Sequence, residues 1–454
     1  MRKIFQYIML AVVTIVMASC TSDIEETTAT TAKNNVQLVV GEFPAFGDSQ
    51  TRAIGTPDEG KTSWAEGDEL LLVIDNTSYG SHSATFTYNG KSWELTSGEL
   101  VYREGDPAYI PHVYYAPNYK WANTSLMLKK GKAAGTDELI EGNAIITGNG
   151  ETITVSFAEA TRKYSRLRIA TLPNEQITVD TEDFTPAGSS DMEQKGNYTL
   201  TSDEKGNAYL YGTFENNSEV TVKYREAALT TYTFSQATEN AKSYALDATV
   251  ISANSAEEIK SAIEQEVADG KTAIRLNLAS DAGDNEFNAI REAFEKVQEG
   301  TIDLTLIGCK EIPANGLNNS FQELEALKSI TLPDVTKLGK RALIYCENLE
   351  TVNAPKVTAI DQQAFYSCQR LEKVILGTLT DVRGEAYSED GIFNGISILK
   401  RQTDLYLPKN QEVMKGEFDE NSNQYIWKPT GKSYFASPND EFLGYQFRSV
   451  RSWK

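Results

Sequence analysis

Apolar residues between positions 327 and 382 recur at an interval of 22 residues. One unit of this length cannot bury its apolar face alone, whereas stacked units share a continuous core. Eight columns of apolar positions in register therefore predict a solenoid, in which equivalent residues of successive repeats lie side by side. The columns are Leu327, Leu349 and Leu371; Ile330, Val352 and Val374; Leu332, Ala354 and Leu376; Val335, Val357 and Leu379; Leu338, Ile360 and Val382; Ala342 and Ala364; Leu343 and Phe365; and Cys346 and Cys368.

Two longer units, each with a helix and a strand, are expected before these repeats. Ser255 followed by Glu258 fits a capping box, after which apolar residues follow the helical period. The offset from Ile259 to Phe287 equals that from Leu276 to Leu304, so Leu276 and Leu304 are expected to be equivalent strand positions. Longer and unequal steps, from Leu304 to Ile330 and from Val374 to Leu405, link the remaining rungs, and Leu407 completes the sixth.

The stretch from about residue 36 to 250 has a different texture, with short alternating runs separated by turn signals such as Asn89-Gly90. About two hundred residues of this kind favour two β-sandwiches over one. The Lys- and Gly-rich stretch 129–142 is the expected seam between them. The expected strands are Val36–Val40, Leu70–Ile74, Ala84–Tyr88, Tyr109–Tyr114, Thr152–Phe157, Leu167–Thr171, Ala208–Tyr211, Glu219–Lys223 and Thr230–Phe234.

The amino terminus has the features of an export signal. Arg2 and Lys3 precede an apolar run that is too short to favour a membrane span. Residues 17–20, Met-Ala-Ser-Cys, resemble a lipobox, which implies that Cys20 is diacylated and becomes the first mature residue. The alternative is an ordinary secretory signal with an unmodified cysteine. The Thr-rich stretch 21–35 is expected to be a flexible tether. Its acidic residues resemble the surface-export signals of Bacteroides-type lipoproteins, which implies the outer face of the outer membrane.

Charge and composition disfavour several classes of function. The 64 acidic and 43 basic residues give a net charge of −21, which repels nucleic-acid phosphates. The two histidines, His82 and His112, lie in strand-like sequence, and no nucleophile elbow, phosphate loop or zinc-protease motif is present. Three further cysteines, without a C-x-x-C pair, suggest neither a disulfide framework nor a metal site. We therefore expect no enzymatic activity, no cofactor, no bound metal and no nucleic-acid partner.

The repeats carry a family resemblance. Residues 327–346, L-K-S-I-T-L-P-D-V-T-K-L-G-K-R-A-L-I-Y-C, and the next copy, 349–368, resemble the BspA-like leucine-rich repeats of oral and gut bacteria, although Asp361 replaces a glycine. The resemblance is specific over about 327–382. It implies attachment to host proteins or to other cells.

A second resemblance covers about residues 36–245. Thr51-Arg52-Ala53, the run 62–68 (T-S-W-A-E-G-D), Tyr114-Tyr115-Ala116-Pro117 and Ser165-Arg166-Leu167 make this half similar to fimbrillin-family (Mfa-like) proteins of Bacteroidales. That family includes pilus subunits that polymerise by donating a terminal strand. The repeats that follow obstruct such donation, so a tip or accessory position in a fimbria is more consistent with this chain than a place in the shaft.

The candidate ligand-binding surface is the outward face of the solenoid strands, where side chains project in rows. The same rows are also what any solvated repeat face displays. The candidate ligand-binding residues are Lys328, Ser329, Glu350, Thr351, Glu372 and Lys373. The structural ladder beneath them is expected to contain Ile330, Leu332, Val352, Ala354, Val374, Leu376, Cys346 and Cys368. The two cysteines are expected to be buried, stacked thiols, with a disulfide between rungs as the alternative.

Two further clusters have a structural and a functional interpretation. An aromatic group could stack on sugar rings, but packing within a sandwich is favoured. A basic group could bind an anion, but a solvated strand face is favoured. The aromatic residues are Tyr109, Tyr114, Tyr115, Tyr119 and Trp121, and the basic residues are Arg162, Lys163, Arg166 and Arg168.

The sequence thus predicts a multidomain chain in which all-β sandwich modules of fimbrillin type precede an α/β leucine-rich-repeat solenoid. We expect a lipid-anchored surface protein that recognises a macromolecule, either a protein or a glycan. The alternatives are an accessory or tip component of a fimbria, and a glycan-binding lipoprotein for nutrient capture. The expected segments are a signal peptide at 1–20, a tether at 21–35, β-sandwiches at 36–140 and 141–250, and the solenoid with its capping ends at 251–454.

Overall fold

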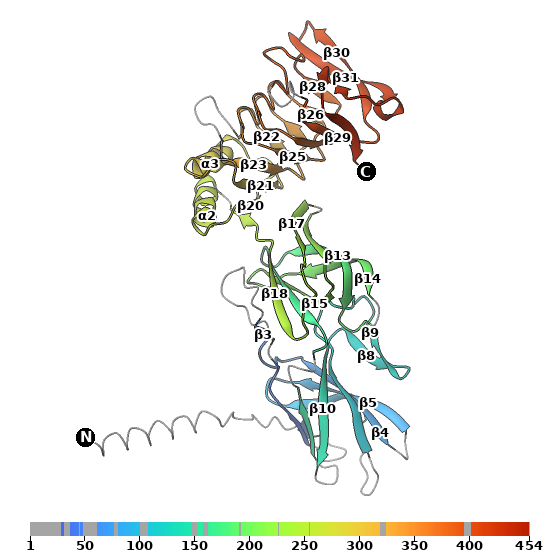
Figure 1. Cartoon of the computed structure of the whole chain (residues 1–454). Helices are drawn as coiled ribbons and strands as arrows, with labels where there is room; N and C mark the ends of the chain where they lie inside the picture. The colour runs from blue at the N-terminus through green and yellow to red at the C-terminus, as the bar shows by residue number, and fades with distance from the viewer. Residues whose placement is uncertain are drawn as a thin grey trace, which may run out of the picture. The chain divides into compact units, whose positions relative to one another are not determined.

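A computed structural model of the chain describes most residues beyond the amino-terminal stretch (Figure 1). The described residues are 29–30, 37–44, 46–48, 61–76, 80–99, 108–147, 152–157, 162–189, 192–225, 227–253, 255–317, 324–394 and 401–453. They form two compact units. The first unit ends at Lys223 and resumes over Thr230–Ala248, and the second contains Tyr224–Leu229 and everything from Thr249 onward. Among the described helices, none is both long and apolar enough to cross a membrane.

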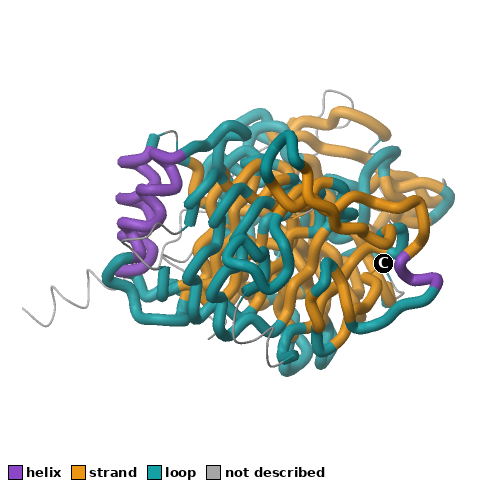
Figure 2. Tube along the Cα trace, turned by 90° about the horizontal axis from the view of Figure 1, so that it is seen from above, coloured by secondary structure: helices purple, strands orange, loops and turns teal. Residues whose placement is uncertain are grey.

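The structure is dominated by strands, and helices are few (Figure 2). In the first unit, one sheet has the strand order β1-β2-β11-β10-β7-β4-β5-β6. Alternating apolar residues of β4, including Leu70, Leu72 and Ile74, face its core together with Trp93. The strands are β1 (Ala29–Thr30), β2 (Gln37–Val40), β4 (Glu69–Asn76), β5 (Gly80–Tyr88), β6 (Trp93–Gly98), β7 (Ala108–Tyr115), β10 (Ile140–Thr147) and β11 (Thr152–Ser156).

Strand β10 joins the two halves of this sheet. Its residues 140–142 pair with β7, whereas its residues 143–147 pair with β11. A strand that changes partners in this way forms the corner between two packed layers. The expected module boundary between residues 140 and 141 therefore falls inside a strand, and the first sheet extends to Ser156. The structure also differs from the expected tether at 21–35, because Ala29 and Thr30 form strand β1, which pairs with β2.

A second sheet, most of which belongs to the same unit, has the order β17-β16-β13-β15-β12-β18-β3, with β14 also paired to β13. Its β3 (Gly47–Asp48) comes from the beginning of the chain and runs parallel to β18. Both sheets are thus built partly from the amino-terminal segment. The other strands are β12 (Ser165–Ala170), β13 (Gln176–Pro186), β14 (Glu193–Thr201), β15 (Asn207–Phe214), β16 (Glu219–Tyr224), β17 (Ala227–Thr233) and β18 (Lys242–Asp247).

The basic cluster at the start of β12 is mostly buried, contrary to the expected solvated face. Arg162, Arg166 and Arg168 are each exposed by less than one tenth, whereas Lys163 remains in solvent. Arg166 Nε donates to Ser243 Oγ at 3.0 Å. The guanidinium groups can be buried because hydrogen bonds and aromatic rings replace their hydration.

The second unit contains two sheets that are parallel for most of their length. The larger has the order β19-β20-β21-β23-β25-β27-β29-β34, and the smaller has the order β22-β24-β26-β28-β31-β30. The larger sheet is built from β19 (Ile251–Ser252), β20 (Ala273–Asn277), β21 (Ile302–Ile307), β23 (Leu327–Thr331), β25 (Thr351–Ala354), β27 (Lys373–Leu376), β29 (Asp404–Pro408) and β34 (Ser449–Trp453). The smaller is built from β22 (Glu311–Ile312), β24 (Lys337–Leu338), β26 (Ala359–Ile360), β28 (Asp381–Arg383), β30 (Glu412–Asp419) and β31 (Gln424–Ser433).

Helices precede β20 and β21 (Figure 1). Helix α2 (Ala256–Ala268) begins after Ser255, whose hydroxyl accepts a hydrogen bond from the Glu258 N–H at 3.3 Å. Helix α3 (Asp284–Phe294) begins after Gly283, whose N–H donates to Glu286. Both helices bury apolar residues in the core that the two sheets share.

The strand register reproduces the 22-residue step of the central repeats. Ile330 lies opposite Val352, and Val352 lies opposite Val374, on neighbouring parallel strands. The longer linking steps are also found as expected, because Leu304 pairs with Ile330 and Val374 pairs with Leu405.

The expected equivalence of Leu276 and Leu304 is wrong for the first strands. Leu276 lies opposite Leu306 rather than Leu304. The step between paired strand residues is therefore longer than the step between the equivalent helix residues. The difference between Leu304 and Leu306 is an even number of positions, which keeps the same side chains on the same face of a strand. The apolar pattern alone therefore could not separate these two registers.

The carboxy-terminal end goes beyond the expected last rung at Leu407. Strand β34 adds one more parallel strand next to β29. In the smaller sheet, β31 pairs antiparallel with β28, and β30 pairs antiparallel with β31. This hairpin reverses the strand direction and ends the parallel pairing of that sheet.

Candidate functional site

The outward side chains of the larger parallel sheet lie in rows that cross the strands. Ser329, Thr351 and Lys373 are direct register partners on β23, β25 and β27. These residues alternate with fully buried ladder positions, as the period of two in a strand requires. A second row contains Thr331, Asn353, Ile375, Tyr406 and Arg451.

The other three candidate binding residues form a separate row at the strand entrances. The Glu350 N–H donates to the Lys328 carbonyl at 2.8 Å, and the Glu372 N–H donates to the Glu350 carbonyl at 2.8 Å. The structure therefore brings Lys328, Glu350 and Glu372 together, one beside the next.

The first strands of the same face are covered. Arg275 on β20 donates from Nε to the Leu229 carbonyl at 2.6 Å, within the second unit. The neighbouring outward residues Thr305 and Ile307 on β21 are buried as well. The second row is therefore accessible from β23 onward, whereas the first row extends to the exposed Asp303 on β21, the register partner of Ser329.

Along the two rows, the side chains change from small and polar to larger and charged. Lys373 Nζ lies 5.3 Å from the centroid of the Tyr406 ring, a cation–π contact. Ile375 is half-buried between them and the earlier rungs, and Arg451 is exposed. Because the direct register partner of Lys373 is the acidic Asp404, this end of the face combines both charges with one aromatic ring. Sequence analysis missed the second row, although its alternation with Val352 and Val374 could have identified it.

Asp404 fixes the last rungs of this face. Its carboxylate accepts hydrogen bonds from Arg448 Nε at 2.9 Å, from Arg448 Nη2 and from Ser449 Oγ at 2.7 Å. The bonds from Arg448 hold the pKa of Asp404 below its ordinary value, although burial opposes this shift. The pair ties the strand β34 to β29 at the edge of the candidate surface.

The ladder residues under the rows are buried, and they have no solvent contact through which to bind a ligand. Cys346 and Cys368 are free thiols, and Cys368 Sγ donates to the Leu343 carbonyl at 3.2 Å. Burial raises the pKa of Cys346 to about 12 and that of Cys368 well above its ordinary value. Both groups therefore act as small apolar side chains rather than as nucleophiles. The ladder set is Ile330, Leu332, Val352, Ala354, Val374, Leu376, Cys346 and Cys368.

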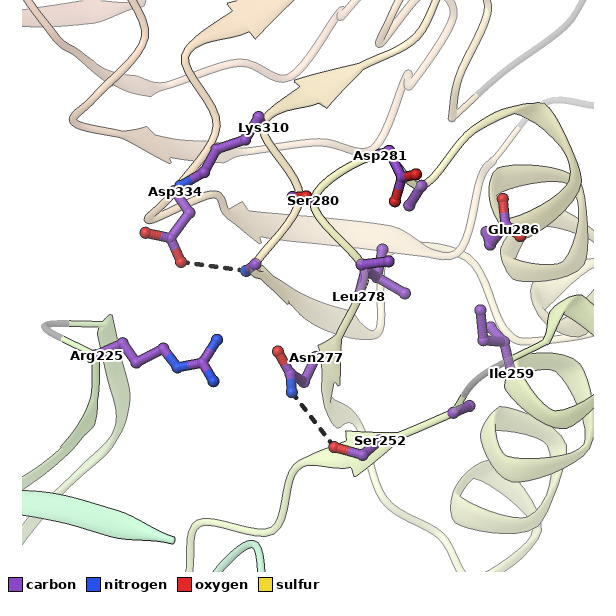
Figure 3. Close-up of a pocket in the computed structure, with 14 residues that line it drawn as sticks. Arg225, Ser252, Ile259, Asn277, Leu278, Ser280, Asp281, Glu286, Lys310 and Asp334 are labelled. Atoms are coloured by element: carbon purple, nitrogen blue, oxygen red, sulfur yellow. Dashed lines mark hydrogen bonds between the residues drawn. The ribbon is translucent and has the colours of Figure 1, made fainter.

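A pocket that the sequence did not indicate lies where β19, β20, β21 and β23 end (Figure 3). Its volume is about 690 Å³. Asp334 accepts hydrogen bonds from the Gly308 N–H at 3.1 Å and from Lys356 Nζ at 3.0 Å, and Asn277 Nδ2 donates to Ser252 Oγ at 3.4 Å. Although burial opposes it, the bonds from Lys356 and Gly308 hold the pKa of Asp334 below its ordinary value. Its lining comes from loops after separate strands, which no local motif reveals.

The aromatic cluster of the first unit is only partly buried, and Tyr109 is 57% exposed, contrary to the favoured packing role. Tyr115 and Tyr119 are buried, as packing within the sheets requires. The rings of His112, Tyr114 and Trp121 are half-buried and nearly parallel, with centroids 5.7 Å apart for His112 and Tyr114 and 6.4 Å apart for Tyr114 and Trp121. Trp121 belongs to a small hairpin, β8 (Tyr119–Ala122) and β9 (Ser125–Leu128).

Some expected features lie outside the described residues. The lipidation residue Cys20, the signal peptide and the motif Thr51-Arg52-Ala53 are among them. Within the described ranges, no group of three or more His, Cys, Asp or Glu side chains is arranged to hold a metal ion.

Comparison with known proteins identifies one region. Among curated proteins, none matches the sequence. Residues 310–406 match six copies of the BspA type leucine rich repeat region. The matched stretch begins shortly after β21 and runs into β29, and it contains all six residues of the predicted ligand-binding surface.

Proposed function

We propose that this protein is a lipid-anchored surface protein that binds a macromolecular ligand through a leucine-rich-repeat solenoid. The match of residues 310–406 to BspA type repeats supports a surface role in protein binding or adhesion. The observation that carries the proposal is the register of the two outward rows over β23, β25, β27 and β29. Parallel rows of small polar side chains on a rigid sheet can accommodate an extended surface of a partner.

A protein is a better ligand for this face than a glycan. Carbohydrate recognition by stacking would need exposed aromatic rings in a row, whereas Tyr406 is the one aromatic residue in the two described rows from β23 to β29. Lys373, Ile375 and Tyr406 instead combine a charge, an aliphatic group and an aromatic ring. Such a mixture is typical of the residues that contribute most to protein interfaces.

The anchor and the first unit belong to the same proposal. A diacylated Cys20 would hold the protein at the outer membrane, since two acyl chains are enough for stable attachment. The first unit, with its resemblance to fimbrillin-family proteins, would link the anchor to the repeats. The net charge of −21 suits a protein that remains soluble while exposed to the medium.

The proposal is tested with the full chain lacking residues 1–20, captured on a surface and screened against extracellular host matrix proteins. The double variant Ile375→Ser/Tyr406→Ser should lower the affinity for any bound protein at least tenfold, because central aromatic and aliphatic contacts dominate interface energies. A matched control, Lys337→Ser/Val413→Ser, changes an equal number of side chains on the smaller sheet and should leave binding unchanged.

Two results would contradict this assignment. Equal binding by the face variant and the control would exclude the strand face as the recognition surface. A ligand that is retained by residues 29–248 alone would move the binding function to the first unit.

A further inference from the structure

A second cavity, of about 500 Å³, lies within the first unit, between segments that are far apart in the sequence. Its volume falls in the range of small-ligand sites. Its floor is formed by Tyr115, Glu138 and Tyr211, which are all buried, and its rim is formed by the turn between β14 and β15. The complete lining is Lys61, Tyr115, Asp137, Glu138, Asp203, Glu204, Lys205, Tyr209 and Tyr211.

The carboxylate of Glu138 is fixed in this floor through only one of its oxygens. Oε2 accepts hydrogen bonds from Arg162 Nε at 3.2 Å and Nη2 at 2.7 Å. Arg162 also donates from Nη1 to the Pro44 carbonyl at 2.7 Å, and its guanidinium lies 4.0 Å from the centroid of the Phe46 ring. Oε1 is buried and has no hydrogen-bond partner among the described residues. A buried acceptor of this kind can accept a hydrogen bond from a molecule bound in the pocket.

The adjacent carboxylate, that of Asp137, has fewer partners than Glu138, which is paired with Arg162. Asp137 Oδ1 accepts only from the Glu138 N–H at 2.8 Å, and no ion pair with Asp137 is found in the described part of the chain. Burial raises the pKa of Asp137 and of Glu138, despite nearby positive charges that act in the opposite direction. Those opposing charges are Lys132 and Lys61 for Asp137, and Arg162 and Arg166 for Glu138. Burial therefore disfavours the charged form of both carboxylates, and a cation bound beside them would stabilise that form.

The same pocket already shows how an ammonium group can be held there. Lys61 Nζ forms an ion pair with Asp68 at 2.5 Å and lies 5.2 Å from the centroid of the Tyr115 ring. Tyr115 in turn donates from Oη to Asp68 at 3.2 Å. The lining of the pocket offers similar groups a second time, because it also contains the Asp137 and Glu138 carboxylates and the rings of Tyr209 and Tyr211.

We propose that this pocket binds an organic cation, with a primary ammonium or guanidinium group that donates to Glu138 Oε1 and Asp137. Such a group supplies several donors together with the positive charge that two carboxylates favour. The tyrosine rings would contact its alkyl stem and add cation–π attraction. The cation could be a free amine or the side chain of a basic peptide. This site is separate from the strand face of the second unit and does not depend on it.

The test is isothermal titration of the full chain, lacking residues 1–20, with four probes. Putrescine represents the free amine, and the methyl esters of N-acetyl-lysine and N-acetyl-arginine represent peptide side chains. N-acetyl-norleucine methyl ester has the stem without the charge. We expect saturable binding of at least one cationic probe and none of the norleucine compound. Binding of putrescine indicates a free amine as the natural source, and binding of the esters alone indicates a peptide.

The variant Asp137→Asn keeps the acceptor for the Glu138 N–H but removes the charge, so cation affinity should fall about tenfold. Glu204→Gln on the exposed rim should weaken binding only about twofold. Glu182→Gln removes an equal charge outside the pocket and should have no effect. Hydrogen exchange of each variant verifies its fold. Binding of norleucine as strong as that of the cations, an unchanged affinity in a folded Asp137→Asn variant, or no binding of any probe would each overturn the proposal.

Discussion

Two adjacent residues of β25 allow a matched test of the sheet that carries the candidate surface. Val352 is fully buried between Ile330 and Val374, whereas Thr351 occupies the outward row. The change Val352→Thr keeps the shape of the side chain but places a hydroxyl group among apolar columns. An unsatisfied buried hydroxyl costs about 1–3 kcal/mol. The reverse change, Thr351→Val, alters a partly exposed position and should shift stability by no more than about 0.5 kcal/mol.

Amide hydrogen exchange with mass spectrometry can measure both changes in the intact chain. A loss of about 2 kcal/mol corresponds to a roughly thirtyfold increase in the opening constant of this region. We therefore expect peptides covering 349–376 to exchange much faster in Val352→Thr, and at the original rate in Thr351→Val. Equal effects of the two changes, or protection that is lost only in Thr351→Val, would refute the assigned inward and outward faces.

Three further predictions concern other parts of the structure. Arg162→Met should destabilise the first unit by about 3–5 kcal/mol in urea unfolding, because it leaves the buried Glu138 carboxylate without its partner. A smaller loss of stability in the double variant Arg162→Met/Glu138→Leu would identify the unpaired charge as the cause. The pKa of Asp404 lies below its ordinary value because of Arg448, so its stabilising effect is present above the pKa of the unfolded chain and is lost as the pH falls through the folded value. Asp404→Asn should therefore flatten the acid side of the stability curve of the second unit, and an unchanged curve would argue against this coupling. Gly308→Ala should destabilise the second unit, because Gly308 has a φ of 89° and an added Cβ would lie 2.2 Å from a backbone carbonyl oxygen; unchanged melting of this variant would contradict the turn geometry.

The sequence predicted the repeat region closely because every column there has the same requirement. Equivalent residues such as Ile330 and Val352 must fill the same buried position in successive repeats, so the sequence shows the same period as the packing. Where the repeats become irregular, the prediction weakened. The pairing of Leu276 with Leu306 was missed because two registers that differ by an even number of positions bury the same face.

The first unit was harder to predict, and so was its pocket. The seam was expected over residues 129–142 because glycine and lysine are frequent in linkers, yet the end of this stretch lies in β10, where Gly142 pairs with β7. The burial of Arg162 could not be anticipated, since charged residues are almost always exposed unless a partner is present. That partner, Glu138, lies 24 residues away, and no local pattern connects them.

The smaller sheet also has a consequence for how the chain can vary in length. Because β24, β26 and β28 follow one another at the same spacing as the strands of the larger sheet, duplication of one repeat would insert a strand into both sheets at once. It would lengthen the array by about 4.8 Å without disturbing the helical start or the antiparallel hairpin at the finish. The length of the array can thus change in equal increments by duplication or deletion of single repeats, while its two ends remain constant.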